Sequence, residues 1–340
     1  MEIKAKIKEV PYKVMLAEDL QIVDIDNFNI NTASAYCLLK NKQQSFAISK
    51  WVSPKRTRSY PYERVYNTLN TKIRITVIPI IKDEGKDGDR DFLQWDTVSL
   101  MSLLNVFVIF AYYDKAIKNS KYDNKITDFQ FDNEYVISKI KEIEQYQSSV
   151  LHWNLNELKY NLHNIVDKAK SSFAKIAQQT SVELHNESGI DNFKEKIGEN
   201  VEDFMQYSRN KAKDAQSREI LTAQPKESLS TVSKAKITIT NYLGGEYFFT
   251  VDEVDIQNDT VYLIESKHSK SSILPSKGDI KDGLLKMILY SNLCEVSVDG
   301  VPMKSEAVLN LTSKKLVGNI NSKCSGSERA NFIFENDLQA

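Results

Sequence analysis

Cysteine is scarce in this sequence of 340 residues. Its three cysteines, Cys37, Cys294 and Cys324, lie far apart and are odd in number. Their spacing fits neither a zinc motif nor a disulfide framework. The sequence therefore predicts a protein of a reducing compartment, and the cytoplasm is the expected location.

Long apolar runs are also missing. No uninterrupted apolar stretch is long enough to cross a bilayer, and the opening run MEIKAKIKEV has no apolar core of the signal-peptide type. We therefore expect a soluble protein without a membrane partner.

A charge excess of one sign is absent as well. The chain has 45 Lys plus Arg and 46 Asp plus Glu, so the overall charge predicts no particular partner. No Walker A glycine loop is present, and no nucleotide cofactor is expected. His152, His163 and His185 have no metal-ligand spacing among them, so they are predicted to be surface or boundary residues.

Glycine and proline are nearly absent from residues 132–222, where Gly189 and Gly198 are the only glycines and proline does not occur. Apolar residues recur there at helical spacing, as in Ile137, Ile140 and Ile143. We predict a series of amphipathic helices that pack on the core, reach around DNA or form a dimer. This helical region separates an N-terminal α/β region, residues 1–131, from a C-terminal region, residues 223–340.

The N-terminal region shows a βαβ-like order, with an apolar strand at residues 72–81, a helix at residues 92–105 and a strand at residues 106–113. A polar loop between the first strand and the helix carries Asp89 and Asp91. These two acids form a weaker, rival metal site, because no Glu-x-Lys sequence follows them.

A basic segment extends from Lys40 to Arg74. It contains nine Lys or Arg residues and one acid, Glu63, which gives a local net charge of +8. Cationic side chains bind phosphates and base edges, and the interleaved aromatic rings stack on bases. The sequence predicts either a solvated basic loop or a DNA contact made by Lys55, Arg56, Arg58 and Arg64.

Residues 250–267, TVDEVDIQNDTVYLIESK, contain the most informative pattern. Two runs rich in β-branched and aromatic residues flank Asn258-Asp259, which is typical of a β-hairpin. The second run ends in Glu265-Ser266-Lys267, and strand side chains two residues apart point to the same face. A carboxylate and an ammonium at the end of a buried strand cost free energy unless they pair, bind a metal or meet a substrate.

This arrangement resembles the PD-(D/E)xK nuclease core, the fold of most type II restriction endonucleases, over about residues 236–320. The resemblance implies a restriction-endonuclease-like α/β core, a mixed sheet flanked by helices. Three antiparallel strands at residues 236–242, 247–256 and 261–267 would precede a helix at residues 279–293 and a strand at residues 307–312. In the family, an Asp and the acid of the Glu-x-Lys hold Mg²⁺, and the Lys positions and activates water. Glu265 and Lys267 match these positions, whereas the proline of the family name is absent.

The family's Asp has two candidates, because the hairpin register decides which acid faces Glu265. A two-residue turn pairs Gln257 with Thr260 and places Asp252 opposite Glu265. A three-residue loop places Glu253 and Asp255 on the face of Glu265 instead. We favour Asp255, which is flanked by apolar residues, as the catalytic residue and metal ligand beside Glu265, and Asp252 stays an alternative ligand.

The resemblance implies a Mg²⁺-dependent DNA endonuclease. The size of the chain and its large flanking regions favour a type II restriction endonuclease that acts on double-stranded DNA as a homodimer. A structure-specific repair, recombination or mobile-element nuclease of the same fold is one alternative, and a non-catalytic nucleic-acid-binding module is the other. On the predicted helix, Lys286 and Tyr290 are expected to face the end of the Glu-x-Lys strand.

Overall fold

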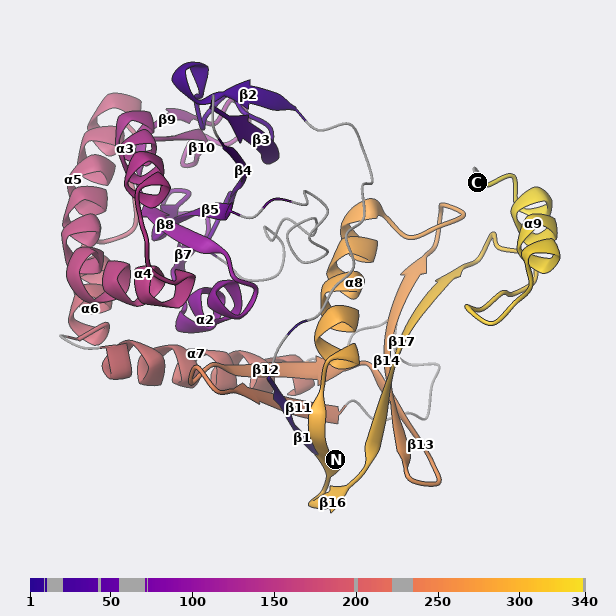
Figure 1. Ribbon diagram of the computed structural model, residues 1–340. Coiled ribbons are helices and arrows are strands. Elements are labelled where there is room, and N and C mark those ends of the chain that lie inside the picture. The colour runs from indigo at the N-terminus through magenta and orange to yellow at the C-terminus, as the bar shows by residue number, and fades with distance from the viewer. Residues whose placement is uncertain are drawn as a thin grey trace. The chain divides into compact units, whose positions relative to one another are not determined.

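The computed structural model describes residues 1–8, 10, 21–41, 44–54, 71, 73–198, 201–221 and 235–338. Helices and mixed sheets alternate along the chain (Figure 1), which confirms the expected mixed α/β class. None of the described helices is long and apolar enough to cross a membrane.

The chain divides into two compact units. The amino-terminal unit comprises residues 7–218 and 239–248, and the carboxy-terminal unit comprises residues 1–6, 219–238 and 249–340. Residues 132–218 belong to the same unit as most of the N-terminal region, so the helical region is not a separate part.

The amino-terminal unit is built on a five-stranded sheet of order β2-β3-β4-β5-β8. β4 (Ser45–Lys50), β5 (Ile73–Pro79) and β8 (Phe107–Ala111) run parallel to one another. β8, with the sequence FVIFA, is buried at every position, as expected for a strand covered on both faces. β3 (Tyr36–Lys40) pairs antiparallel with β4, and β2 (Ile22–Asp24) pairs parallel with β3 at the edge of the sheet.

Helices and two hairpins surround this sheet. The helix expected at residues 92–105 is the shorter α2 (Trp95–Leu103), because residues 90–92 are used in a hairpin strand. The helices predicted between residues 132 and 222 are confirmed. The elements are the hairpins β6 (Ile81–Asp83) with β7 (Arg90–Phe92) and β9 (Tyr113–Lys118) with β10 (Ile126–Phe131), the short helix η1 (Ile25–Asn27), and then α3 (Asn133–Glu144), α4 (Val150–Asn156), the π-helical turn η2 (Glu157–Asn161), α5 (Leu162–Thr180), α6 (Ser188–Lys196) and α7 (Val201–Leu221).

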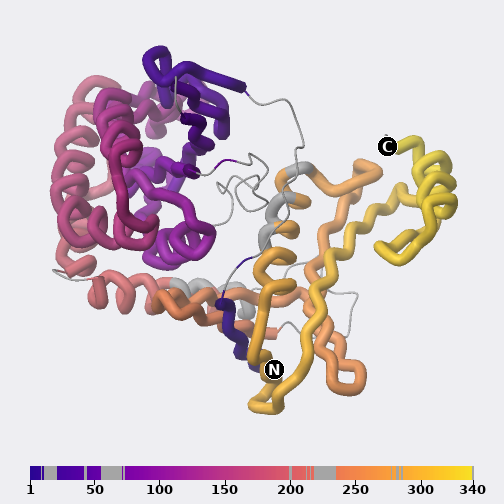
Figure 2. The backbone as a smooth tube through the Cα atoms, viewed as in Figure 1, coloured from indigo at the N-terminus to yellow at the C-terminus, as the bar shows by residue number. Residues whose placement is uncertain are grey.

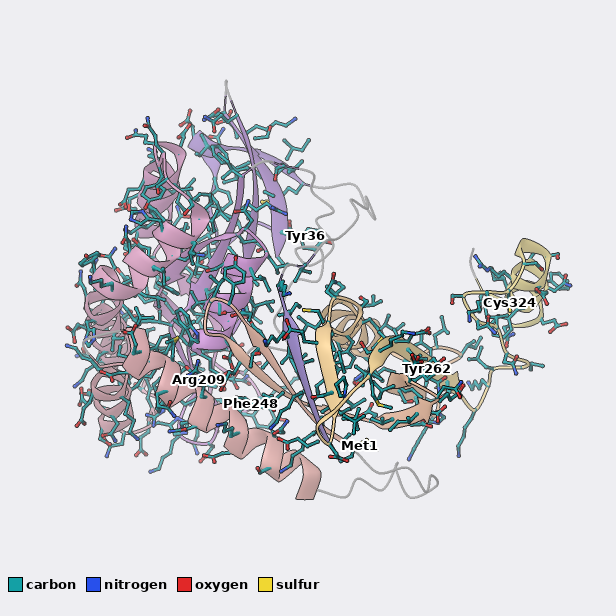
Figure 3. The ribbon with its side chains drawn as sticks, turned by 60° about the horizontal axis from the view of Figure 1, so that its bottom comes forward. Met1, Tyr36, Arg209, Phe248, Tyr262 and Cys324 are labelled. Carbon is teal, nitrogen blue, oxygen red and sulfur yellow. The ribbon has the colours of Figure 1, made fainter. Side chains whose placement is uncertain are left out.

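The carboxy-terminal unit contains most of a second five-stranded sheet, of order β12-β11-β1-β15-β16. Its strands are β1 (Glu2–Ile7), β11 (Ala235–Asn241), β12 (Glu246–Val251), β15 (Cys294–Val298) and β16 (Val301–Pro302). The tip of the β11–β12 hairpin belongs to the amino-terminal unit, where Arg209 Nε lies 3.3 Å from Glu246 Oε2. Figure 3 labels Arg209 and Phe248 in this region.

A three-stranded sheet of order β13-β14-β17 completes the carboxy-terminal unit. β13 (Glu253–Gln257) and β14 (Thr260–Ser269) form an antiparallel hairpin, which appears in Figure 2 as an orange loop. β17 (Lys304–Ser313) runs parallel to β14, and α8 (Lys277–Ser291) lies in the connection between them, packed on both strands (Figure 1). α9 (Gly326–Glu335) follows near the C-terminus. The helix and the strand expected after residue 267 are therefore confirmed.

Candidate active site

Asp252 lies at the point where the chain passes from one sheet to the other. β12 ends at Val251 and β13 begins at Glu253, so the single strand expected at residues 247–256 is in fact two strands separated by a bend. The backbone N–H of Ser266 donates a hydrogen bond to Asp252 Oδ2 at 3.1 Å. This bond fixes the Asp252 carboxylate beside the end of β14.

The observed hairpin has a two-residue turn. Gln257 pairs with Thr260, and Asn258 has a left-handed φ of 55°, which asparagine tolerates in turns. Continuing this register by one residue beyond β13 places Asp252 opposite Glu265.

Asp255 does not lie on the face of Glu265, so the three-residue loop that would have placed it there is not formed. It pairs with Tyr262, which is labelled in Figure 3, and opposed residues of an antiparallel pair share one face. The face of Glu265 is that of the buried Leu263, one residue along from Tyr262. The Asp255 side chain is exposed and accepts a hydrogen bond from Gln257 Nε2 at 2.7 Å.

Glu265 is a carboxylate buried at the end of an apolar strand face, with 1% of its surface exposed. Its Oε1 lies 2.9 Å from Lys267 Nζ, and its Oε2 lies 2.8 Å from Lys286 Nζ. The two ammonium groups offset the large cost of removing a carboxylate from water. β14 therefore brings Glu265 and Lys267 together as the sequence predicted.

Lys286 comes from α8 and also donates a hydrogen bond to the backbone oxygen of Thr250 at 3.3 Å. The prediction that Lys286 faces the end of the strand is therefore confirmed. Tyr290, one turn further along α8, is buried.

Gly283 allows α8 to approach the strands at this point. A Cβ on this residue would lie 2.7 Å from Leu309 Cδ1 and 3.6 Å from Lys267 Cε. Leu309 pairs with Glu265 across the parallel β14–β17 ladder, so the glycine lies against the residues that form the site. The absence of a side chain at residue 283 brings the helix that carries Lys286 close to Glu265.

The oxygen ligands at this site suit a magnesium ion. Mg²⁺ is commonly held by one or two carboxylates together with water and substrate phosphates. Asp252 and Glu265 supply two carboxylates, and the buried Thr250 Oγ1 has no hydrogen-bond partner among the described residues. The described part of the chain contains no group of three or more His, Cys, Asp or Glu residues arranged to hold a metal. Two carboxylates alone would leave most of the coordination of a Mg²⁺ ion to water and a phosphate.

The structure describes the rival metal-binding acids but not the predicted DNA-contacting residues. The rival acids Asp89 and Asp91 lie in and beside the β6–β7 hairpin, where Asp91 pairs with Lys82 and accepts a hydrogen bond from Ser53 Oγ at 2.8 Å. They form no metal cluster with other described residues. The predicted DNA-contacting residues Lys55, Arg56, Arg58 and Arg64 lie outside the described residues.

Comparison with known proteins adds no further information. No protein-family model, no curated protein and no solved structure matches this chain. The function of the site therefore has to be inferred from its own geometry and chemistry.

Proposed function

We propose that this chain is a Mg²⁺-dependent DNA endonuclease that hydrolyses phosphodiester bonds, and that it is a type II restriction endonuclease. The observation that carries the proposal is the buried Glu265 carboxylate, which lies 2.9 Å from Lys267 Nζ at the end of β14. Asp252, bonded to the backbone of the intervening Ser266, supports the same interpretation. The resemblance to the PD-(D/E)xK core supplies the reaction class.

Asp252 and Glu265 are the residues that would hold Mg²⁺. The ion, when bound, polarises the phosphodiester and lowers the pKa of a coordinated water. Lys267 extends from the same strand face as Glu265, where its ammonium would orient the attacking water and offset the negative charge that builds on the phosphate oxygens.

Lys286 is proposed as a positioning residue. Its ammonium bridges Glu265 Oε2 and the backbone oxygen of Thr250, which ties the carboxylate to the end of β12. This tie would keep the Glu265 side chain in one orientation while the other carboxylate oxygen exchanges partners.

A cleavage assay with paired variants tests the proposal. Plasmid and phage DNA are incubated with Mg²⁺ or with EDTA and the wild-type chain, Glu265→Gln, Asp252→Asn or Asp255→Asn. We expect Mg²⁺-dependent cleavage that Glu265→Gln and Asp252→Asn reduce by about a thousandfold or more, the equivalent of about 4 kcal/mol of transition-state stabilisation. Asp255→Asn is the matched control, because its exposed carboxylate lies on the opposite face. It should keep its activity.

The products distinguish the forms of the proposal. Discrete fragments support a site-specific restriction enzyme, whereas a metal-dependent smear supports a structure-specific nuclease of the same fold. If Asp255→Asn were inactive and Asp252→Asn active, the assignment of the metal ligand would be refuted. If none of these substrates were cut, whether linear or branched, methylated or unmethylated, the nuclease proposal would be refuted.

A non-catalytic nucleic-acid-binding module is the second candidate function. It is favoured by one observation, that both oxygens of Glu265 are already engaged by lysine ammonium groups. In that case DNA would bind equally well with Mg²⁺ and with EDTA, no product would form, and Lys267→Ala would alter only stability.

A further inference from the structure

A cavity of about 370 Å³ lies in the amino-terminal unit, outside the carboxyl ends of the parallel strands β4, β5 and β8. Lys50 ends β4, Lys82 lies on β6 just after β5, and Tyr113 begins β9 just after β8. The β9–β10 hairpin provides much of the remaining wall. Ligands of open α/β sheets bind at this edge, and the volume is in the range of small-molecule sites.

One wall of the cavity is aromatic and held in place. The ring of Tyr113 lies 4.5 Å from that of Phe131 and 4.9 Å from that of Phe129, measured between centroids. Asn31 fixes this wall, because its side chain accepts a hydrogen bond from the backbone N–H of Phe131 and donates one to the backbone oxygen of the same residue. Tyr113 and Phe131 are almost fully buried, at 2% and 5% exposure, so Phe129 is the ring of this cluster that faces the cavity. An aromatic ring held in this way suits contact with a planar ligand.

Lys50 places a half-buried cation in the cavity. Its ammonium donates to the backbone oxygens of Ile30, at 2.7 Å, and Asn31, at 3.2 Å. Both acceptors are neutral, and an ammonium has three hydrogens to donate. Burial lowers the pKa of Lys50, which reflects the cost of keeping this charge away from water. An anionic ligand would offset that cost and accept the remaining hydrogen.

The rim adds charged groups of both signs. Lys82 Nζ lies 5.2 Å from the centre of the Phe129 ring and 2.6 Å from Glu84 Oε1. Lys125 and Asp128 also line the cavity from the β9–β10 hairpin. The cavity therefore combines an aromatic ring at Phe129, cations for an anionic group and carboxylates able to accept hydrogen bonds from amino groups.

We propose that this cavity binds a nucleotide. The base would lie against Phe129, which Tyr113 and Phe131 support from behind, and the phosphate would face Lys50 and Lys125. Glu84 and Asp128 would accept hydrogen bonds from the donor groups of the base. A free nucleoside monophosphate has this chemistry, and so does a nucleotide extruded from a DNA strand. The inference concerns a different unit from Glu265 and does not depend on the nuclease proposal.

Calorimetric titration of the intact chain tests the binding. The probes are the four 2′-deoxynucleoside 5′-monophosphates, the corresponding nucleosides and deoxyribose 5-phosphate. At least one monophosphate should bind saturably, with one site per chain. Its nucleoside and the sugar phosphate should each bind at least about tenfold more weakly, because each lacks one half of the recognised chemistry. Absence of saturable binding by every nucleotide would overturn the proposal.

Paired lysine variants locate the site. Lys125→Gln, which removes a partly exposed charge from the rim, should weaken binding by about fivefold or more, and Lys50→Gln by about tenfold or more. Lys121→Gln is the matched control, because Lys121 is exposed on the same hairpin and does not line the cavity. Equal affinities for Lys125→Gln and Lys121→Gln would overturn the assignment, even if Lys50→Gln failed to fold.

Competition with DNA identifies the source of the nucleotide. All titrations are made in EDTA with the Glu265→Gln background, so the result is independent of whether the chain cuts DNA. Displacement of the nucleotide by single-stranded or mismatched oligonucleotides would assign the cavity to an extruded base. In that case Lys125→Gln should also weaken the binding of these oligonucleotides. Retention of the nucleotide in the presence of these oligonucleotides would assign it to a free nucleotide.

Discussion

Glu265 shows how one buried carboxylate organises residues from distant parts of the sequence. Lys267 is two residues away on the same strand, and Lys286 comes from the following helix. The side chains of the two lysines are 17% and 12% exposed, so each ammonium can reach water if its partner is removed. The Glu265 carboxylate cannot reach water in the same way. Its contribution to the free energy of unfolding therefore depends on its ion pairs with the two lysines.

A double-mutant cycle measures this dependence. We expect Glu265→Gln to destabilise the carboxy-terminal unit by about 2 kcal/mol, below the value for a fully buried pair because both lysines reach solvent. Lys286→Met should cost about 1 kcal/mol, and the coupling between the two substitutions should be about 1 kcal/mol. Hydrogen exchange of the β14 amides provides the measurement.

Tryptophan fluorescence provides the control for this cycle. Trp51, Trp95 and Trp153, the only tryptophans of the chain, all lie in the amino-terminal unit. The unfolding transition followed by their fluorescence should be unchanged in both variants. Additive effects of the two substitutions would show that Glu265 and Lys286 are not coupled.

The position of the proposed metal-binding Asp could not be predicted from the sequence alone. Glu265 and Lys267 were identified because strand alternation fixes their common face without any knowledge of the turn. The choice between Asp252 and Asp255 depended on whether Asn258-Asp259 closes the hairpin with two residues or with three. Both loop lengths accept these residue types, and a slip of one residue moves every side chain to the other face.

At the scale of elements, the contact of α8 with the sheet depends on Gly283. Gly283→Ala places a methyl group 2.7 Å from Leu309 Cδ1, so the leucine has to move and the helix loses part of the stability that alanine normally adds. Gly278→Ala, in the first turn of the same helix, meets only Ser276 Oγ at 3.8 Å. We expect Gly278→Ala to stabilise the unit by about 0.5 kcal/mol and Gly283→Ala to destabilise it by about 1 kcal/mol, as measured by denaturant unfolding followed by circular dichroism.

The two glycines form a matched pair for activity as well. Gly283→Ala should reduce cleavage because Lys267 and Leu309 lie at the same contact, and Gly278→Ala should leave it unchanged. Equal effects of the two substitutions would show that α8 does not position the proposed site.

The stability of α9 is predicted to depend on pH through its N-terminal cap. None of the side chains of α9 is buried, and Ser325 and Glu328 form a reciprocal capping box. Hydrogen bonds from the Ser325 hydroxyl and backbone N–H lower the pKa of Glu328 below its usual value of 4.5. Because the folded-state pKa is the lower one, the stabilisation is present above the unfolded-state pKa and is lost as pH falls through the folded-state value.

Helix content and amide exchange of residues 326–335 between about pH 6 and about pH 3 test this expectation. Amide protection should fall over this interval in the wild-type chain. In the Ser325→Ala variant, amide protection of this helix should be lower than in the wild type at about pH 6. It should then change little as the pH falls to about 3. An identical pH profile in both proteins would rule out the capping box as the cause.

The hairpin, the helix α8 and the strand β17 were predictable from the sequence, but the break between β12 and β13 and the elements β15, β16 and α9 were not. The connection from β14 to β17 includes α8, and a crossover with a helix is what a parallel pair of strands requires. Val251 and Glu253 belong to different sheets, yet neither glycine nor proline marks the bend at Asp252. The alternation of apolar and polar residues indicates which side chains of a strand are buried. It does not indicate to which sheet the strand belongs.

At the scale of the whole molecule, the proposed cleavage of both DNA strands favours a homodimer. Each chain offers one candidate site at Glu265, and a duplex has two strands of opposite direction, which a two-fold dimer would match. We expect the protein to cut both strands as a homodimer. A mixture of wild-type chains with an excess of Glu265→Gln chains should then produce mainly nicked plasmid, as measured by gel electrophoresis. Linear product in proportion to the wild-type fraction alone would show that single chains act independently.

The central position of β1 in its sheet has a consequence for synthesis. β1 lies between β11 and β15, and residues 8–234 separate it from β11. At about 5–20 residues per second, a ribosome needs roughly 10–50 s to produce that interval. Throughout this time the residues that become buried in the sheet, Ile3, Ala5 and Ile7, have no strand on either side. The nascent chain therefore emerges with an unpaired amphipathic strand that chaperones would have to shield until β11 leaves the exit tunnel.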